Sequence, residues 1–314
     1  MRGGGAQDEA LAQMSAKTGL LVFGGGGQIG HELCRATHRS GARVTGLGHA
    51  AVDITRIDDV LKAVGESRPA VVVNAAAYTR VDQAESEPDA AFTVNRDGAR
   101  HVAEACREAG AALIHLSTDY VFDGTKPAAY DEDDAVNPLG VYAKSKEAGE
   151  RAVRDALGRH VILRTSWVFG AKGGNFVKAM LRAAGEGDEL RVVDDQFGCP
   201  TPAMYVAEAI LAMAPAVAGG KSGTFHFSAA GRTSWHGFAK EIFARRREIT
   251  GQPSPPLRPV ATADRPAPAP RPANSELDCS RLAATFGVAQ RSWRHGLVDV
   301  LNELLKEGLM RNYR

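Results

Sequence analysis

The feature that most constrains the fold is a run of four consecutive glycines, 24–27, placed between a short apolar segment and an amphipathic one. The apolar segment LLVFG (20–24) is typical of a buried strand, and a helix is expected from the glycines to about Ser40. Glycine permits a sharp turn and a close approach to a pyrophosphate, and the helix N-terminus offers free N–H groups to phosphates. The run, extended by Gly30, reads as GxGxxG or GxxGxxG and predicts a dinucleotide-binding loop; the alternative is a flexible connection.

Apolar runs alternate with amphipathic stretches as far as residue 170. The runs predict further strands at 42–47, 70–77, 112–118 and 160–170, with helices at 57–67 and 88–109. Apolar strands flanked by helices indicate a parallel sheet covered on both faces. We therefore expect an α/β fold, a doubly wound parallel sheet of the Rossmann type, over residues 19–170.

The alternation weakens in the second half of the chain. Helices are expected at 174–184, 203–213, 234–247 and 295–309, with a strand at 224–228. This pattern predicts a smaller C-terminal α/β substrate domain over 171–314, with about 203–228 returning to the first domain. Eight prolines within 252–272 argue against regular structure there and favour a loop or linker.

Composition excludes several classes of function. Lys and Arg number 38 against 37 Asp and Glu, so the net charge of +1 offers no footprint for nucleic acid. No stretch reaches the ~18 apolar residues of a membrane span, and residues 1–18 lack the apolar core of a signal peptide, which makes them a predicted disordered leader. Met14 is a possible alternative start. The four cysteines are far apart without a CxxC motif, so we expect reduced thiols and a cytoplasmic location.

The second predicted strand bears on the choice of nicotinamide cofactor. NAD-specific sites usually carry an acid at the end of this strand, about 20 residues after the glycine loop. Here the strand ends in Gly46, Leu47, Gly48 and His49, without a carboxylate. The sequence therefore favours NADPH, with NADH possible, and Asp53 could lie under the adenine ring.

A candidate proton-transfer pair is Tyr142 with Lys146. Pro138 can begin a helix that continues to about Ala156, and residues four apart lie on one face of such a helix. An ammonium beside a phenol favours the phenolate, so we expect the pKa of Tyr142 to lie below its usual ~10. The YxxxK pattern is common by chance, and its position after the glycine loop and the fourth strand gives it weight.

Polar residues end the fourth predicted strand. Ser117, Thr118 and Asp119 lie at the carboxyl edge, where open α/β sheets bind their ligands. A hydroxyl there can hydrogen-bond a substrate carbonyl and the tyrosine together. The alternative is an ordinary capping or turn hydroxyl.

The chain resembles the dTDP-4-dehydrorhamnose reductase family of the extended short-chain dehydrogenase/reductases, from about residue 20 to 305. The likeness is carried by FGGGGQIGHEL (23–33), VVNAAAYTRVDQAESEP (72–88), LSTDYVFDG (116–124), NPLGVYAKSKEAGE (137–150), RTSWVFG…GGNF (164–176), DDQFGCPT (194–201) and RPANSELD (271–278). The combination is specific although each segment alone is not.

The resemblance implies a role for each matching residue. Cofactor-binding residues would be Gly24, Gly27, Gln28, Ile29 and Gly30 at the pyrophosphate, Asp53 and Ile54 at the adenosine, Ala77, Tyr78 and Thr79 after the third strand, and Tyr142 and Lys146 at the nicotinamide ribose. Catalytic residues would be Tyr142 as proton donor, Lys146 and Thr118. Substrate-binding residues would be Thr118 and Asp119 at the sugar, Trp167 at the hexose and Asn175 toward the nucleotide.

The reaction that the resemblance implies is NAD(P)H-dependent reduction of the C4 ketone of dTDP-4-dehydro-L-rhamnose to dTDP-L-rhamnose. The alternatives are a nucleotide-sugar epimerase or dehydratase, or a non-catalytic regulatory subunit on the same fold. A dehydratase would follow the threonine with an Asp-Glu pair, whereas Tyr120 stands where that glutamate would be. Some members of the family bind magnesium and form dimers, and Glu32 matches an acidic position of the family. The sequence assembles no metal site around it. Magnesium binding and the choice between monomer and homodimer therefore stay open.

Overall fold

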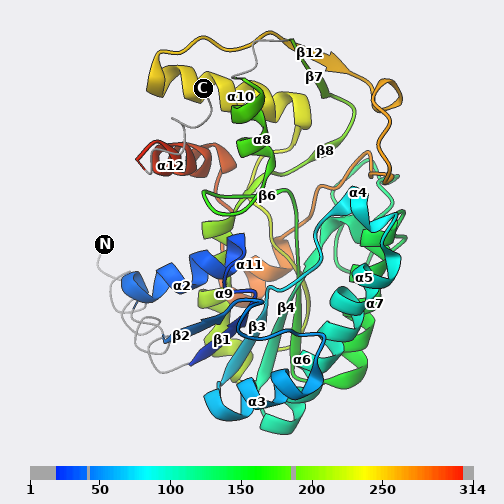
Figure 1. The fold of residues 1–314 in the computed structure, drawn as a ribbon, viewed down its shortest axis with the longest axis vertical. Coiled ribbons are helices and arrows are strands. Elements are labelled where there is room, and N and C mark those ends of the chain that lie inside the picture. Colours follow the sequence, from blue (N-terminus) through cyan, green and yellow to red (C-terminus); the bar gives the residue numbers. More distant parts are fainter. Residues whose placement is uncertain (1–18, 41–42, 185–188, 307–314) are drawn as a thin grey trace.

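The computed structural model describes residues 19–40, 43–184 and 189–306. The predicted leader (1–18) and the last residues of the predicted final helix (307–309) lie outside this part of the chain. The described residues form a sheet with helices on both sides, and a second group of helices and short strands stands above the carboxyl ends of the strands in Figure 1.

The central sheet has six parallel strands in the order β10-β5-β4-β3-β1-β2. Their bounds are Leu20–Phe23 (β1), Val44–Leu47 (β2), Val71–Asn74 (β3), Ala112–Thr118 (β4), His160–Thr165 (β5) and Gly223–His226 (β10). The strand order reverses between β1 and β3, which is where such sheets open a crevice for ligands. The predicted fold class is confirmed.

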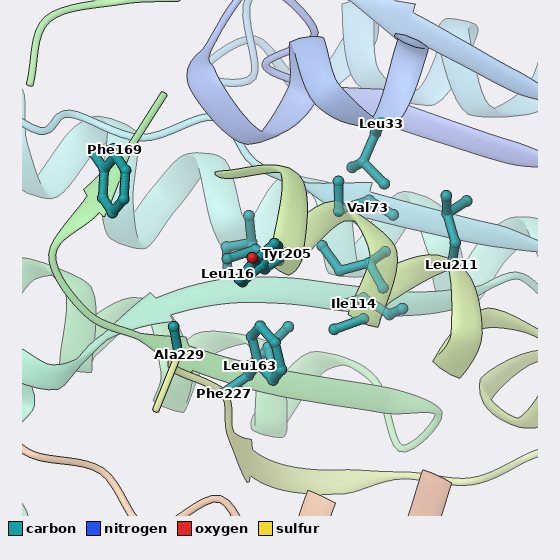
Figure 2. Close-up of a cluster of buried hydrophobic side chains, with 14 of the residues drawn as sticks. Leu33, Val73, Ile114, Leu116, Leu163, Phe169, Tyr205, Leu211, Phe227 and Ala229 are labelled. Atoms are coloured by element: carbon teal, nitrogen blue, oxygen red, sulfur yellow. The ribbon is translucent and has the colours of Figure 1, made fainter. Parts of the chain in front are cut away.

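Residues of β1 alternate between two buried clusters, because successive side chains of a strand point to opposite faces. Leu20 and Val22 pack in the cluster with α2 (Gln28–Ser40) and α9 (Ala203–Ala218). Figure 2 shows part of this cluster, with Leu33 of α2 and Leu211 of α9 among the labelled side chains. The other face is covered by α3 (Ile57–Ser67), α6 (Ala99–Ala109) and α7 (Val141–Ala156).

Two predicted elements are interrupted. The helix predicted at 88–109 consists of α5 (Pro88–Phe92), a π-helical turn η1 (Thr93–Gly98) and α6, preceded by the short α4 (Val81–Ala84). The strand predicted at 160–170 ends at Thr165, because Trp167 has a left-handed backbone (φ 46°). The chain then leaves the sheet as β6 (Val168–Phe169), which pairs with β9 (Thr201–Pro202).

The upper group of elements in Figure 1 comes from the second half of the chain. It contains α8 (Phe176–Ala183), β7 (Leu190–Val193), β8 (Phe197–Gly198), β11 (Thr233–Ser234), α10 (Trp235–Thr250), β12 (Leu257–Val260), η3 (Thr262–Asp264) and α12 (Trp293–Lys306), while α11 (Ser280–Phe286) lies beside the sheet. The same half also supplies α9 and the sheet strand β10. The division at residue 170 into two domains remains a prediction.

The expectation that 252–272 has no regular structure is wrong. Residues 257–260 form β12, which pairs in parallel with β7, and Pro259 is opposite Val192. Hydrogen bonds to β7 reach the carbonyls of Pro256 and Val260, and such bonds fall on alternate residues of a strand. The ring nitrogen of Pro259 therefore lies on the side that faces away from β7, where an edge strand tolerates proline.

Two further observations concern sequence features of the whole chain. Within the described ranges, no helix is long and apolar enough to cross a membrane. All four cysteines are free thiols.

Candidate active site

A cavity of about 620 Å³ lies at the carboxyl ends of β1 and β3 and borders the glycine loop. Seven of the residues expected at the cofactor line it, namely Gly24, Gly27, Asp53, Ile54, Ala77, Tyr78 and Thr79. His49 and Arg80 also line it. The expected adenosine-side and strand-end residues are thus brought together in one place.

The glycine loop packs tightly against the sheet on one side and is open on the other. A Cβ added at Gly30 would lie 2.2 Å from the carbonyl oxygen of Gly24, and one added at Gly25 would lie 2.9 Å from the carbonyl carbon of Gly46. Gly24 itself has φ 82°. A Cβ at Gly26, by contrast, would meet no atom within 4 Å. Tight packing places the N-terminus of α2 beside the cavity, where its N–H groups can meet an anion.

Asp53 is held by its own turn. Its Oδ1 atom accepts hydrogen bonds from the N–H (3.0 Å) and the hydroxyl (2.8 Å) of Thr55. Burial would raise the pKa of Asp53, but these hydrogen bonds outweigh it, so that the pKa lies below its usual range. The carboxylate is therefore a fixed negative group in the cavity, in the segment that follows β2.

A second cavity, of about 480 Å³, adjoins the first and shares Gly27, Ala75, Ala77 and Thr79 with it. It is lined by the expected catalytic and sugar-side residues Thr118, Asp119, Tyr142, Lys146 and Trp167, together with Gln28 and Ile29 of the loop. Strand β4 brings Thr118 to this point, and α7 brings Tyr142 and Lys146 on one face. The two cavities share lining residues and together hold the expected adenosine-side and catalytic residues.

Thr118 links the tyrosine to a buried acid. Its side chain shares a hydrogen bond with Tyr142 and donates one of 3.0 Å to Oδ1 of Asp119. Burial raises the pKa of Asp119 to about 7, although its hydrogen bonds oppose the shift. Its other oxygen, Oδ2, is buried without a hydrogen-bond partner. The side chain of Ser275 also acts on this carboxyl and lowers its pKa.

Lys146 is directed at the strand. Its Nζ donates a 2.7 Å hydrogen bond to the carbonyl oxygen of Leu116, and only 3% of the residue is exposed. Burial lowers the pKa of Lys146 to about 8, while the charge of Glu150 acts in the opposite direction. The ammonium form is therefore only moderately favoured at neutral pH.

The expectation of a lowered tyrosine pKa is wrong. Burial raises the pKa of Tyr142 to about 12, a shift that Asp119 reinforces and the hydrogen bond with Thr118 opposes. Lys146 is not among the groups that shift it. Tyr142 is thus a neutral phenol at physiological pH, and its hydroxyl carries a proton.

An aromatic pair forms one wall of the second cavity. The rings of Trp167 and Trp235 stack with centroids 3.5 Å apart and an angle of 4° between their planes. Phe176 packs against Trp235 at 4.7 Å. The left-handed backbone of Trp167 is a strained conformation for a non-glycine residue, and it turns this ring toward the cavity.

Asn175 does not line either cavity. Its Oδ1 caps α8 by accepting from the N–H of Lys178 (3.1 Å). Its Nδ2 donates to Oε1 of Gln28 (3.0 Å) and to the carbonyl of Gly170 (2.7 Å). The amide therefore holds the loop residue Gln28 in place.

Glu32 is also engaged in structural contacts. Its Oε1 accepts a 3.0 Å hydrogen bond from Arg35, which also pairs with Glu303. In the described ranges no group of three His, Cys, Asp or Glu side chains could hold a metal ion.

Sequence reasoning missed several residues of the site. Trp235 and Tyr120 line the second cavity, and the ring of Tyr120 meets that of Tyr142 edge-on with centroids 6.2 Å apart. Arg271 forms a bidentate pair with Asp82, at 2.9 Å to each oxygen, which ties the RPANS segment to α4. The position of Tyr120 directly after Thr118 and Asp119 was a usable signal, whereas Trp235 reaches the site only through tertiary packing.

Comparison with known proteins places these residues in a family. Residues 18–306 match the family described as "RmlD substrate binding domain". The chain belongs to this family. The RmlD match includes the glycine loop, both cavities and the RPANS segment.

Similar proteins include a dTDP-4-dehydrorhamnose reductase from Sinorhizobium fredii (strain NBRC 101917 / NGR234), 44% identical over 92% of this chain and 98% of the relative. A crystal structure of dTDP-4-dehydrorhamnose reductase from Bacillus anthracis str. Ames in complex with NADP is 37% identical, with a TM-score of 0.85 over 91% of this chain and 99% of that one. A dTDP-4-dehydrorhamnose reductase from Clostridium acetobutylicum ATCC 824 is 36% identical, with the same TM-score and coverage. The RmlD fold is therefore shared over almost the whole described chain.

Proposed function

We propose that this chain reduces the C4 ketone of dTDP-4-dehydro-L-rhamnose to dTDP-L-rhamnose with NAD(P)H. The observation that carries the proposal is that Thr118, Tyr142 and Lys146 line one cavity that adjoins the cavity of the glycine loop. Relatives named dTDP-4-dehydrorhamnose reductase, one of them solved with NADP, support the same reaction.

The loop and its cavity fit a dinucleotide. The open side of Gly26 and the α2 N-terminus suit a pyrophosphate, and Asp53 suits the adenosine side. NADPH is the proposed preference, since β2 ends without a carboxylate, and Arg80 offers positive charge for a 2′-phosphate. When bound, the dihydronicotinamide supplies a hydride to the carbonyl carbon.

Tyr142 supplies the proton. As the carbonyl carbon gains the hydride, its oxygen becomes an alkoxide and takes the proton of the Tyr142 hydroxyl, which is held in its neutral form by burial. Thr118 hydrogen-bonds the developing oxyanion, a contribution of about 2.7–4 kcal/mol if it acts as a measured oxyanion donor does. Lys146 holds the ribose.

The sugar is held beside Thr118. The partnerless Oδ2 of Asp119 and the partnerless hydroxyl of Thr165 are buried polar atoms on residues that line the cavity, and sugar hydroxyls would satisfy them. Trp167 offers its ring to the hexose. Asn175 acts on the site through Gln28 rather than by direct contact.

The test is a reductase assay on purified protein with dTDP-4-dehydrorhamnose and NADPH, followed by loss of dihydronicotinamide absorbance. Tyr142→Phe should lower kcat about 100-fold or more, in the range expected for loss of a general acid. Tyr120→Phe is the matched control, since it removes a hydroxyl from the neighbouring ring, and it should retain most activity. Equal turnover of Tyr142→Phe and wild type would refute the proton-donor role.

The same preparation separates the alternatives. An epimerase would retain tightly bound NAD after purification, and a regulatory subunit would copurify with an enzyme and show no reductase activity of its own. A dehydratase is disfavoured by Tyr120, which stands where elimination chemistry would place a glutamate.

A further inference from the structure

Helix α7 carries a column of four polar side chains, one per turn: Tyr142, Lys146, Glu150 and Arg154. The first two line the catalytic cavity. Glu150 lies one turn behind them, outside the cavity, and is completely buried. A carboxylate in such a place is costly unless it is paired and hydrogen-bonded.

Glu150 is paired on both of its oxygens. Oε1 accepts from the hydroxyl of Ser117 (2.6 Å) and from Nε of Arg164 (2.8 Å). Oε2 accepts from Arg164 (2.7 Å) and from Arg154 (2.8 Å). These partners outweigh burial and hold the pKa of Glu150 below its usual range. Glu150 is therefore a permanent negative charge behind the site.

The column is attached to consecutive residues of β4. Lys146 donates to the carbonyl of Leu116, and the next residue, Ser117, donates to Glu150. Thr118, which follows, shares a hydrogen bond with Tyr142. Three successive strand residues are thus engaged by three side chains of one helix, so the position of Glu150 fixes how α7 lies on the catalytic strand.

The charges that face Lys146 are few. His115 of β4 is buried with its pKa well below the usual range, and burial lowers the pKa of His226 of β10, beyond Arg164, to about 4, so both are neutral. Other ionisable groups on elements packed against α7 have their own partners or are exposed. Glu85 at the end of α4 accepts from the N–H of Val141, Asp89 of α5 is exposed, and Asp97 of η1 pairs with Arg96. Arg107 of α6 donates to the carbonyl of Ala156, Asp119 of η2 accepts from Thr118, and His160 of β5 bonds the carbonyl of Leu157.

We infer that Glu150 is a positioning residue for the reaction: its buried carboxylate keeps the ammonium of Lys146 charged and aligned along β4. The inference rests on the proposed function, in which Lys146 must be charged to hold the ribose. Burial pulls the pKa of Lys146 down to about 8, and Glu150 is the charge that resists this shift. Without it, Lys146 would lose its proton near neutral pH.

The test is the pH profile of kcat in Glu150→Gln, since glutamine can still accept the hydrogen bond from Ser117 but carries no charge. In wild type the alkaline limb should fall near pH 8, set by Lys146. In the variant it should move down by about one pH unit, so activity at pH 8 falls about tenfold while activity at pH 6 changes less than about twofold. Affinity for NADPH should weaken over the same pH range.

Two control variants separate charge from scaffolding. Arg154→Gln removes one ion pair of Glu150 but leaves its charge, and Arg151→Gln removes the exposed pair with Glu147 on the same helix. Both should keep the wild-type limb. A shift in Arg154→Gln as large as that in Glu150→Gln would overturn the inference, because the effect would then follow the network and not the charge. An unchanged limb in Glu150→Gln would overturn it as well.

Glu150→Gln leaves Arg164 as a buried cation without its partner and can fail to fold. The double variant Glu150→Gln/Arg164→Met removes one negative and one positive charge, so its limb should lie between those of wild type and Glu150→Gln. The wild-type profile is itself decisive, since a limb below about pH 7 would mean that Glu150 does not keep Lys146 charged. If the wild type shows no reductase activity, the proposed function fails, and the pH dependence of NADPH binding still tests the coupling.

Discussion

Gly30→Ala tests whether the close contact between α2 and the glycine loop builds the cofactor site. An alanine Cβ at position 30 would lie 2.2 Å from the carbonyl oxygen of Gly24 and 2.8 Å from Cα of Gly25. These are backbone atoms and cannot rotate away, so the first separation must grow to about 3.4 Å by moving the helix or the loop. Overpacking of this kind costs typically about 1–3 kcal/mol. The N–H groups at the displaced helix N-terminus would also no longer point toward the pyrophosphate.

The assay is urea unfolding with and without NADPH, together with a direct measurement of the NADPH Kd. We expect Gly30→Ala to lose about 1–3 kcal/mol of unfolding free energy. The Kd should rise about tenfold or more, since 1.4 kcal/mol is tenfold in affinity. Gly65→Ala is the matched control, because its Cβ meets no atom within 4 Å on α3, and alanine there should gain up to about 1 kcal/mol.

Gly26→Ala separates the two effects of the loop. Its Cβ meets no protein atom within 4 Å but lines the cavity, so the unfolding free energy should stay unchanged while the Kd for NADPH rises. If Gly30→Ala proved as stable as Gly65→Ala and bound NADPH like wild type, the packing argument for the loop would be wrong.

Two further changes probe the sugar side. Asp119→Asn should remove a pH dependence of stability. Burial raises the pKa of Asp119 in the folded state to about 7, so the wild type loses up to about 4 kcal/mol of unfolding free energy as pH rises from about 4 to 7, and the variant should not. Equal pH slopes of wild type and variant in urea unfolding would contradict this. Trp235→Ala removes the ring stacked on Trp167 and should raise the substrate KM about twofold to tenfold, the equivalent of about 0.5–1.5 kcal/mol, while the NADPH Kd stays unchanged. A change in the NADPH Kd instead of the KM would place this ring on the cofactor side.

The central sheet was predictable because it is buried on both faces. A parallel strand covered on two sides must be apolar at every position, as Val71, Val72 and Val73 show, and such runs stand out against amphipathic helices. Helix starts were less predictable. Pro138 suits a first helical turn, yet α7 begins at Val141, where the side chain of Glu85 accepts the hydrogen bond of the first N–H. That partner comes from another part of the chain.

The short sheet of β7 and β12 shows a second limit. Proline usually excludes a strand because it lacks the N–H that a ladder needs. Pro259 is tolerated because β12 pairs on one side only, with Val192 as its opposite residue. Whether a strand is an edge depends on the whole topology, and composition alone does not contain that information.

The remaining features that the sequence did not predict lie where the backbone at the site is irregular. The π-turn of η1 buries Asn95, whose side chain accepts from the N–H of Tyr78 (2.9 Å) and donates to its carbonyl (3.1 Å) and to Ser145 (2.9 Å). One amide thereby joins the cofactor-side loop to the helix that carries Lys146. The left-handed Trp167 similarly turns a ring from the end of β5 into the catalytic cavity. Patterns of period 2 or 3.6 describe regular elements, so they fail where the chain leaves regularity to place a functional side chain.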